Sequence, residues 1–288
     1  MTLLNFRDPA TSAHPGGDRI RAGILFRSAQ PFPSAAGGVV ESLRAKGVAT
    51  VVDLRGAAER SADDWAAARA AGIRVVRAPL DAEDDDAIAG PGIGSLRTAA
   101  DLGLFYVALA RSAPRAVADA VRAAAAPGAT LLHCAAGKDR TGLLVALLLD
   151  LAGLPAEGIV ADYARTAEAL PQVFAALAAH RGIALNAGPT SADGGAAPDT
   201  AVRAASPHGA PVLRGEPGRT VPAPLLQAPP EAMRVFLETV RANHGGAEGF
   251  LLSCGVEDDA VAAFRAKASP AVPAADGAFA TAVTTPAH

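Results

Sequence analysis

The sequence Ala129-Thr-Leu-Leu-His-Cys-Ala-Ala-Gly-Lys-Asp-Arg-Thr-Gly142 joins a short apolar run to the start of a long apolar segment through a tight loop. Residues 130–132 favour a buried strand, and residues 143–152 are apolar on all sides, as in a helix at the centre of a domain. A strand, a loop and a helix in this order direct backbone N–H groups and the positive end of the helix dipole to one point. We therefore expect this loop to bind an anion such as phosphate.

Two chemically useful side chains, Cys134 and Arg140, lie in this loop with five residues between them. A thiol reacts as the thiolate, which a helix N-terminus and nearby cations stabilise. Arg140 offers a planar fork of donors that fits two oxygens of a phosphoryl group. Thr141 can hydrogen-bond the sulfur, and His133 can orient the loop through its backbone. The pattern predicts a cysteinyl-phosphate intermediate. The alternative, a small buried apolar Cys134 at a strand end, leaves the arginine spacing unexplained.

The run His133-Cys-Ala-Ala-Gly-Lys-Asp-Arg-Thr-Gly142 resembles the signature loop of the cysteine-dependent protein tyrosine phosphatases. Its Gly137-Lys-Asp-Arg140 portion resembles an atypical bacterial branch with protein-tyrosine and phosphoinositide activity. The resemblance covers about three-quarters of the chain, and only this loop is specific by itself. It implies that Cys134 attacks phosphorus while Arg140 and the loop amides hold the oxygens. The phosphate-binding loop residues would then be Ala135, Ala136, Gly137, Lys138 and Thr141.

The leaving group needs a proton, and two aspartates are candidates for the general acid. The resemblance favours Asp139, next to Arg140, because the Asp of Gly-Lys-Asp-Arg is thought to be that acid in the branch. Asp81, in an acidic loop, stands where many tyrosine phosphatases carry a mobile acid loop. Lys138 is either a solvated surface charge or a second cation that attracts substrates with extra phosphates.

Charged residues elsewhere also resemble family elements. Asp53-Leu54-Arg55, with Glu59 beyond, resembles an Asp-Leu-Arg…Glu element at the carboxyl end of a strand. In α/β folds this end of the sheet carries the ligand site, although Asp53 and Arg55 are equally suited to a structural ion pair. Asn5-Phe-Arg-Asp8 and Phe26-Arg-Ser28 resemble the N-terminal signature, and we expect Arg27 to tie that segment to the core.

The rest of the chain predicts an α/β fold with a central, mostly parallel sheet of four or five strands, flanked by helices. We expect a hairpin or strand pair at residues 20–28, strands at 48–54 and 73–78, and a helix at 57–71. A further helix is expected from residue 155 to 170.

Composition divides the chain into four parts. Residues 1–181 are the expected phosphatase core, and residues 182–224 read as a flexible insertion rich in Gly, Pro and Ala. We expect residues 225–268 to form C-terminal helices that pack on the core, and residues 269–288 to form a disordered tail. A lid over the site is doubtful, because only residues 198–205 of the insertion favour a helix, and weakly.

Bulk properties narrow the function classes. A net charge of −3 gives no electrostatic case for nucleic acid or membrane binding, and no window is long and apolar enough for a membrane span. Cys134 and Cys254, the two cysteines, make a poor disulfide framework, which favours a reducing compartment. We read Cys254 as a helix-packing residue. With no signal peptide visible, we expect a cytoplasmic protein, although export without a signal is not excluded.

The loop predicts a phosphomonoester hydrolase without a metal or cofactor. The resemblance implies phosphotyrosine as its substrate, with phosphoserine and phosphothreonine as further candidates. A phosphoinositide or inositol-phosphate phosphatase is the alternative among enzymes. A phospho-ligand binding module that no longer turns over is the alternative from another class, and sulfur transfer is a distant third. The sequence leaves the oligomeric state open.

Overall fold

The computed structural model describes residues 3–11, 19–32, 34–81, 92–180 and 221–270. At its centre is a sheet of four described strands, all parallel, in the order β1-β4-β2-β3. The strands are β1 (Leu25–Ser28), β2 (Val48–Asp53), β3 (Arg74–Arg77) and β4 (Ala129–His133). The predicted α/β class with a parallel sheet of at least four strands is confirmed.

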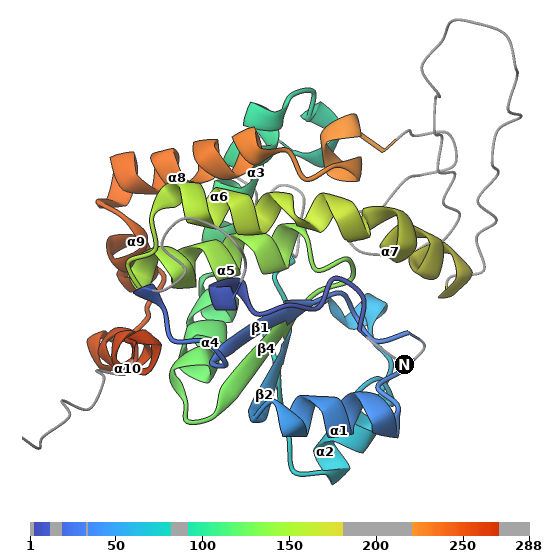
Figure 1. Ribbon diagram of the computed structural model, residues 1–288. Coiled ribbons are helices and arrows are strands. Elements are labelled where there is room, and N and C mark those ends of the chain that lie inside the picture. The colour runs from blue at the N-terminus through green and yellow to red at the C-terminus, as the bar shows by residue number, and fades with distance from the viewer. Residues whose placement is uncertain (1–2, 12–18, 33, 82–91, 181–220, 271–288) are drawn as a thin grey trace, which may run out of the picture.

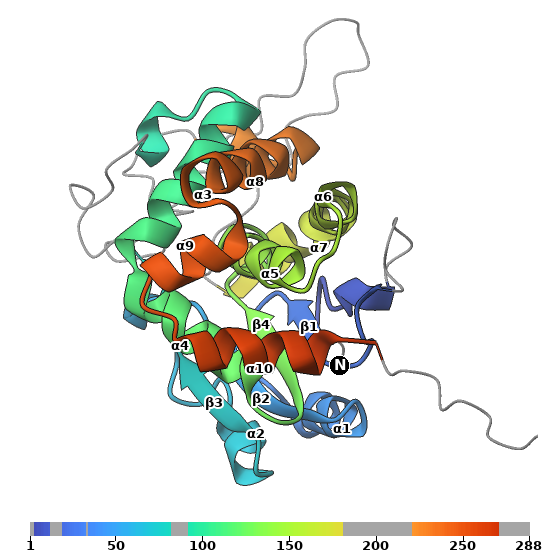
Figure 2. The same ribbon diagram turned by 90° about the vertical axis from the view of Figure 1, so that its left-hand side faces the viewer.

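Helices cover both faces of this sheet (Figure 1). Figure 2 shows α1 and α2 below the sheet and α5, α6 and α8 above it. The helices are α1 (Gly37–Ala45), α2 (Ala66–Ala70), α3 (Ala99–Ser112), α4 (Pro114–Ala125), α5 (Asp139–Leu151), α6 (Ala156–Ala164), α7 (Thr166–His180), α8 (Pro230–His244), α9 (Ala247–Ser253) and α10 (Asp258–Ala268).

Side chains that alternate along the strands contribute to two hydrophobic core clusters, one on each face of the sheet. Val51 and Leu131 are register partners on β2 and β4, and both belong to the cluster on the side of α1 and α2. Their neighbours Val52 and Leu132 are also partners, and both belong to the larger cluster with α3, α4 and α5. Successive side chains of a strand point to opposite faces, so a continuous apolar run is needed where both faces are covered.

The position of β4 fixes the centre of the molecule, since β4 pairs with β1 on one side and β2 on the other. The chain leaves its carboxyl end through a short loop and enters α5, in which every residue except Asp150 is buried. This is the strand, loop and buried helix that the sequence predicts. The loop therefore lies above the middle of the sheet, at the edge where parallel α/β sheets carry their ligands.

Two predicted elements are wrong. Residues 20–28 form no hairpin: β1 is a single strand parallel to β4, and the antiparallel partner of Arg27 is Arg7, in an isolated bridge.

The helix expected at 57–71 is reduced to a 3-10 turn, η3 (Ala57–Glu59), and α2. Side chains compete with a helix here, because Glu59 accepts from the Gly56 N–H and Asp64 from the Ser61 N–H. The helix expected at 155–170 divides into α6 and α7.

The C-terminal helices pack on the core. Helix α8 lies against α3 and α6, and α10 lies against α4. Cys254 follows the end of α9, half-buried against the main core, and burial raises the pKa of its thiol to about 11. Nearly all of the predicted insertion and tail, including residues 198–205, falls outside the described residues. In the described part of the chain, every helix is too short or too polar to traverse a bilayer.

The contact between α3 and α8 predicts the effect of Gly103→Ala. A Cβ at Gly103 would lie 2.5 Å from the carbonyl oxygen of Ala232 and 2.8 Å from the Cβ of Val235. Separating the two helices should lower the free energy of unfolding by about 1–3 kcal/mol, measured by urea denaturation. Gly38→Ala is the matched control, because nothing lies within 4 Å of its Cβ position in α1. Equal stability of the two variants would contradict this account of the packing.

Candidate active site

Cys134 opens a loop of residues 134–138 between β4 and α5, and its side chain is buried. Three strands end together beneath it, because Ser28 at the end of β1 and Asp53 at the end of β2 are both in register with His133. The residues that follow these strands therefore lie near the start of the loop.

The carbonyl groups of four consecutive loop residues are all hydrogen-bonded to groups outside the loop. The contacts are His133 Nδ1 to the Cys134 oxygen (3.3 Å), Gln30 N to Ala135 (3.1 Å), Asn5 Nδ2 to Ala136 (3.2 Å) and to Gly137 (3.0 Å), and Arg27 Nη2 to Gly137 (2.8 Å). Each peptide plane of the loop is thus held from its oxygen side.

The N–H side of the same peptide planes is open. A trans peptide is planar, so the N–H that follows each of these carbonyls points away from the carbonyl's partner. These are the N–H groups of Ala135, Ala136, Gly137 and Lys138. Within the part of the chain that the structure describes, no group accepts a hydrogen bond from them. Four free amides beside a helix N-terminus form a site for an oxyanion.

Gly137 is required by the shape of this loop. Its φ is +68°, in the left-handed region that L side chains rarely adopt. A Cβ here would also lie 2.3 Å from the carbonyl oxygen of Ser28. The loop therefore passes too close to the end of β1 for any larger residue.

Arg140, in the first turn of α5, is buried and fixed by carboxylates. Glu59 accepts from both terminal nitrogens, at 2.5 Å and 2.9 Å, and Asp81 accepts from Nη1 at 3.2 Å. Burial lowers the pKa of Arg140, but the charge of Glu59 outweighs it and the pKa is raised. The Nε atom is buried without a hydrogen-bond partner among the described residues, so this edge of the fork is free for a ligand.

Asp81 lies at the same guanidinium but is more accessible. Its side chain is 25% exposed. Burial is the main cause of a raised pKa at Asp81, and the charge of Glu59 adds to it, while that of Arg140 opposes it. A partly exposed carboxyl with a raised pKa beside the phosphate-binding arginine has the properties of a proton donor.

Asp139 has different surroundings. Its side chain is 2% exposed, and its Oδ1 accepts from the Tyr106 hydroxyl at 2.5 Å and pairs with Lys138 Nζ at 2.9 Å. The Tyr106 hydroxyl also forms a hydrogen bond with that of Tyr163, at 2.7 Å.

Lys138 is fully buried and donates to the carbonyl of Gln227 at 2.7 Å, just after η6 (Ala223–Leu226). The solvated-charge interpretation of Lys138 is therefore wrong, because the C-terminal segment covers it.

Thr141 lies in the first turn of α5. Its Oγ1 is buried and has no hydrogen-bond partner among the described residues, so the expected bond to the Cys134 sulfur is not formed. The hydroxyl is left free to donate to a ligand or to the sulfur at a later stage of a reaction.

His133 supports the loop from below. Trp65 Nε1 donates to His133 Nε2 at 2.9 Å, so the ring proton is on Nδ1, which faces the carbonyl of Cys134. Burial lowers the pKa of His133 to about 4, against the opposing charge of Asp53. The ring is therefore neutral at pH 7.

Asp53 and Arg55 form a buried ion network beside His133. Arg55 Nη2 lies 2.8 Å from Asp53 Oδ2 and 2.7 Å from Asp64 Oδ2, and its Nη1 donates to Gln30. Burial raises the pKa of Asp53, but the charge of His133, which is protonated below about pH 4, and that of Arg55 lower it to about 2. Since these groups satisfy one another, the geometry favours the structural interpretation.

Four residues that shape the site had no identifying signal in the sequence: Gln30, Trp65, Tyr106 and Gln227. Tyr106 lies within an apolar helix and resembles an ordinary core residue. Gln227 is 89 residues from its partner Lys138 in the chain. Only their contacts in the fold identify them.

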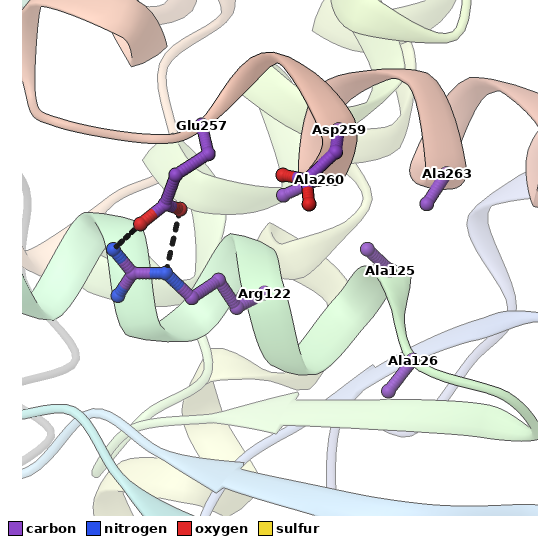
Figure 3. Close-up of a pocket in the computed structure, with 7 residues that line it drawn as sticks. All are labelled: Arg122, Ala125, Ala126, Glu257, Asp259, Ala260 and Ala263. Carbon is purple, nitrogen blue, oxygen red and sulfur yellow. Dashed lines mark hydrogen bonds and ion pairs between the residues drawn. The ribbon is translucent and has the colours of Figure 1, made fainter.

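A shallow hollow elsewhere is not part of this site (Figure 3). It lies between α4 and α10, lined mainly by alanines and by Arg122 and Glu257, which form an ion pair at 2.6 Å. Ala125 and Ala126 of its lining precede the amino end of β4, whereas Cys134 follows the carboxyl end. The two places are therefore at opposite ends of the central strand.

Comparison with known proteins agrees with the loop geometry. A model described as "Tyrosine phosphatase family" matches residues 1–269. A Cupriavidus necator protein named as a tyrosine-protein phosphatase is 34% identical over 167 residues, 56% of this chain and 60% of that protein. The tyrosine-protein phosphatase of Nostoc commune is 34% identical over 142 residues, covering 48% and 38%. The triple specificity protein phosphatase PtpB of Mycobacterium tuberculosis is 32% identical over 196 residues, covering 59% and 69%. The chain thus spans less than two thirds of the first two relatives.

The neutral His133 predicts a pH dependence of stability. The unfolded chain takes up this proton near pH 6.5, but the folded chain only near pH 4. Between these values the free energy of unfolding should fall as the pH falls, by up to about 1.4 kcal/mol per pH unit for one proton. His133→Gln should remove this contribution. Between pH 6 and pH 5, the free energy of unfolding of this variant, measured by urea denaturation, should therefore fall less than that of the wild type. Parallel losses would contradict a neutral buried His133.

Proposed function

Because the chain belongs to the tyrosine phosphatase family, we propose that it hydrolyses phosphate monoesters, phosphotyrosine above all, through a cysteinyl-phosphate intermediate. The observation that carries the proposal is one loop that combines the buried Cys134, four free amides and the fixed guanidinium of Arg140, whose charge interacts with Cys134. Phosphoryl transfer depends mainly on positioning and charge stabilisation, which such a loop provides.

In the first step the Cys134 thiolate forms a bond to phosphorus while the bond from phosphorus to the leaving oxygen breaks. The amides of residues 135–138 and the free edge of Arg140 hold the three remaining oxygens. A bidentate guanidinium suits this task because its fork matches two oxygens at once. The helix dipole of α5 favours the same negative charge.

We assign the proton donor in this step to Asp81. A general acid must reach the leaving oxygen and carry a proton at the working pH. Asp81 is partly exposed and has a raised pKa, whereas one oxygen of the buried Asp139 already accepts from Tyr106 and Lys138. These contacts suit a residue that holds Lys138 against the loop.

In the second step water attacks phosphorus, and the bond from phosphorus to sulfur breaks. Asp81, now ionised, takes the proton of the water, and inorganic phosphate and the Cys134 thiolate are released. The free hydroxyl of Thr141 supports this step, since it can donate to the sulfur as negative charge develops there.

Substrate range and location follow from the same chemistry. The name of the mycobacterial relative, a triple specificity phosphatase, supports activity on more than one class of phosphate ester, with phosphoinositides as the alternative substrate class. Lys138 is bonded within the protein, so it acts on the loop rather than as a mobile cation at the surface. A nucleophilic cysteine must stay reduced, which supports a cytoplasmic location.

The proposal predicts that Cys134→Ser loses hydrolysis of phosphotyrosine peptides by at least about 10³-fold, because a serine hydroxyl is a poor nucleophile without a base. Calorimetric binding of tungstate should persist, since the amides and Arg140 remain. Released phosphate would be measured on phosphotyrosine peptides, phosphoserine peptides and inositol lipids. An active serine variant would exclude Cys134 as nucleophile, and an inactive wild type that binds tungstate would indicate a binding module.

The assignment of the acid predicts a dependence on the leaving group. Asp81→Asn should slow phenyl phosphate hydrolysis by about 10²-fold or more, and p-nitrophenyl phosphate hydrolysis much less, because p-nitrophenolate leaves without a proton. Asp139→Asn is the matched control and should slow both substrates to a similar degree. If Asp139→Asn instead lowered kcat/KM far more for phenyl phosphate than for p-nitrophenyl phosphate, and Asp81→Asn lowered both equally, Asp139 would be the general acid.

A further inference from the structure

Asn5 lies in the N-terminal segment, outside the helices and strands, yet its side chain reaches the phosphate-binding loop. Its Nδ2 donates to the carbonyl oxygens of Ala136, at 3.2 Å, and of Gly137, at 3.0 Å. These two carbonyls belong to the peptide planes whose N–H groups come from Gly137 and Lys138. One amide therefore holds two of the four planes of the anion site.

The orientation of the Asn5 amide is set by Arg7. The Nη1 of Arg7 donates to Asn5 Oδ1, so the NH₂ end of the amide must face the loop. Arg7 is itself fixed by Asp162 on α6: its Nε lies 2.7 Å from Asp162 Oδ1, and its Nη2 donates to the Asp162 carbonyl at 2.7 Å. Asp162 also pairs with Arg27, at 2.6 Å. A rotation of the amide would therefore bring its oxygen against two carbonyl oxygens and its NH₂ against a guanidinium.

The backbone at this position is unusual. Asn5 has φ +55°, and in the described part of the chain it is the non-glycine residue with a positive φ. Its neighbours hold the segment along β1: Ala29 N–H donates to the carbonyl of Leu4 at 2.9 Å, and the rings of Phe6 and Phe26 stack at 5.4 Å. Glycine adopts this φ at least as easily, so the feature that asparagine adds is its side-chain amide.

We propose that Asn5 is a positioning residue of the anion site: its amide turns the peptide planes between residues 136 and 138 so that their N–H groups face the bound oxyanion. This inference rests on the proposed function of the same loop. Asn5 acts from the carbonyl side and does not touch the substrate. An N–H group that points away from the oxyanion stabilises the transition state much less, because the donors of such a site act only in a fixed geometry.

The test is Asn5→Gly, which keeps the backbone conformation and removes only the amide. Tungstate is the probe, and its dissociation constant is measured by titration calorimetry on the full-length chain. We expect the variant to bind tungstate at least about tenfold more weakly than the wild type, and kcat/KM for p-nitrophenyl phosphate to fall by a similar or larger factor. The variant also loses three hydrogen bonds, so its thermal unfolding midpoint should fall, and a control variant with a lowered midpoint must separate this effect from the loss of tungstate affinity.

Phe6→Leu is the matched control, because Phe6 lies next to Asn5 in the chain but contacts the second core cluster rather than the loop. It should lower the unfolding midpoint and leave the tungstate affinity within about twofold. Asn5→Asp provides a second variant, since its carboxylate keeps the shape and the pairing with Arg7 but donates nothing to the loop. It should reproduce the loss of tungstate affinity.

The outcomes separate this inference from the proposed function. Equal tungstate affinity in the wild type and in Asn5→Gly would overturn the positioning role, whatever the activity. A parallel loss in Phe6→Leu would reduce Asn5 to a structural tether and would also overturn it. A wild type that hydrolyses no phosphate ester, but whose tungstate affinity falls in Asn5→Gly, would overturn the proposed function alone.

Discussion

The rest of this structure depends on a constraint at the carbonyl side of one short loop. Four N–H groups of residues 135–138 have no partner among the described residues, although they lie within the protein, and an unpaired buried amide is costly. The loop would relieve this cost by rotating its peptide planes. Hydrogen bonds to each carbonyl, from β4, from the residues after β1 and from the N-terminal segment, prevent the rotation. The surrounding fold therefore stabilises a loop that is unfavourable by itself.

Buried charges form the second level of this support. Arg27 joins Asp162 and the carbonyl of Gly137, while Arg140 is held by Glu59 and Asp81. Arg55, whose charge acts on His133, joins Asp53 and Asp64. Each guanidinium has at least one carboxylate, which buried charges require. Because a guanidinium has five donors in a rigid plane, it can bond a carboxylate and still keep an edge for a carbonyl or a ligand.

The sequence predicts well what is contiguous in the chain. The strand, the loop with Cys134 and Arg140, and the buried helix follow one another without interruption within residues 129–151, so periodicity and spacing suffice to identify them. The parallel sheet also follows, because β-branched runs alternate with helical ones. The hairpin at 20–28 and the helix at 57–71 were wrong because long-range pairing and side-chain bonds override local preference. Tyr106, Gln227 and the contacts of Asn5 could not be predicted, since each joins residues far apart in the chain.

The bond between Lys138 and Gln227 has a consequence for the order in which the site is assembled. The two residues are 89 positions apart, so a ribosome delivers the whole catalytic loop well before the carbonyl that receives its lysine. During that interval the nascent chain has Asn5, Cys134 and Arg140 but an ammonium group without its final acceptor. Gln227 lies just before α8, which packs on α3 and α6, so the docking of this helix brings the acceptor to Lys138. Completion of the reaction centre therefore waits until residue 227 has been synthesised and has folded against the loop.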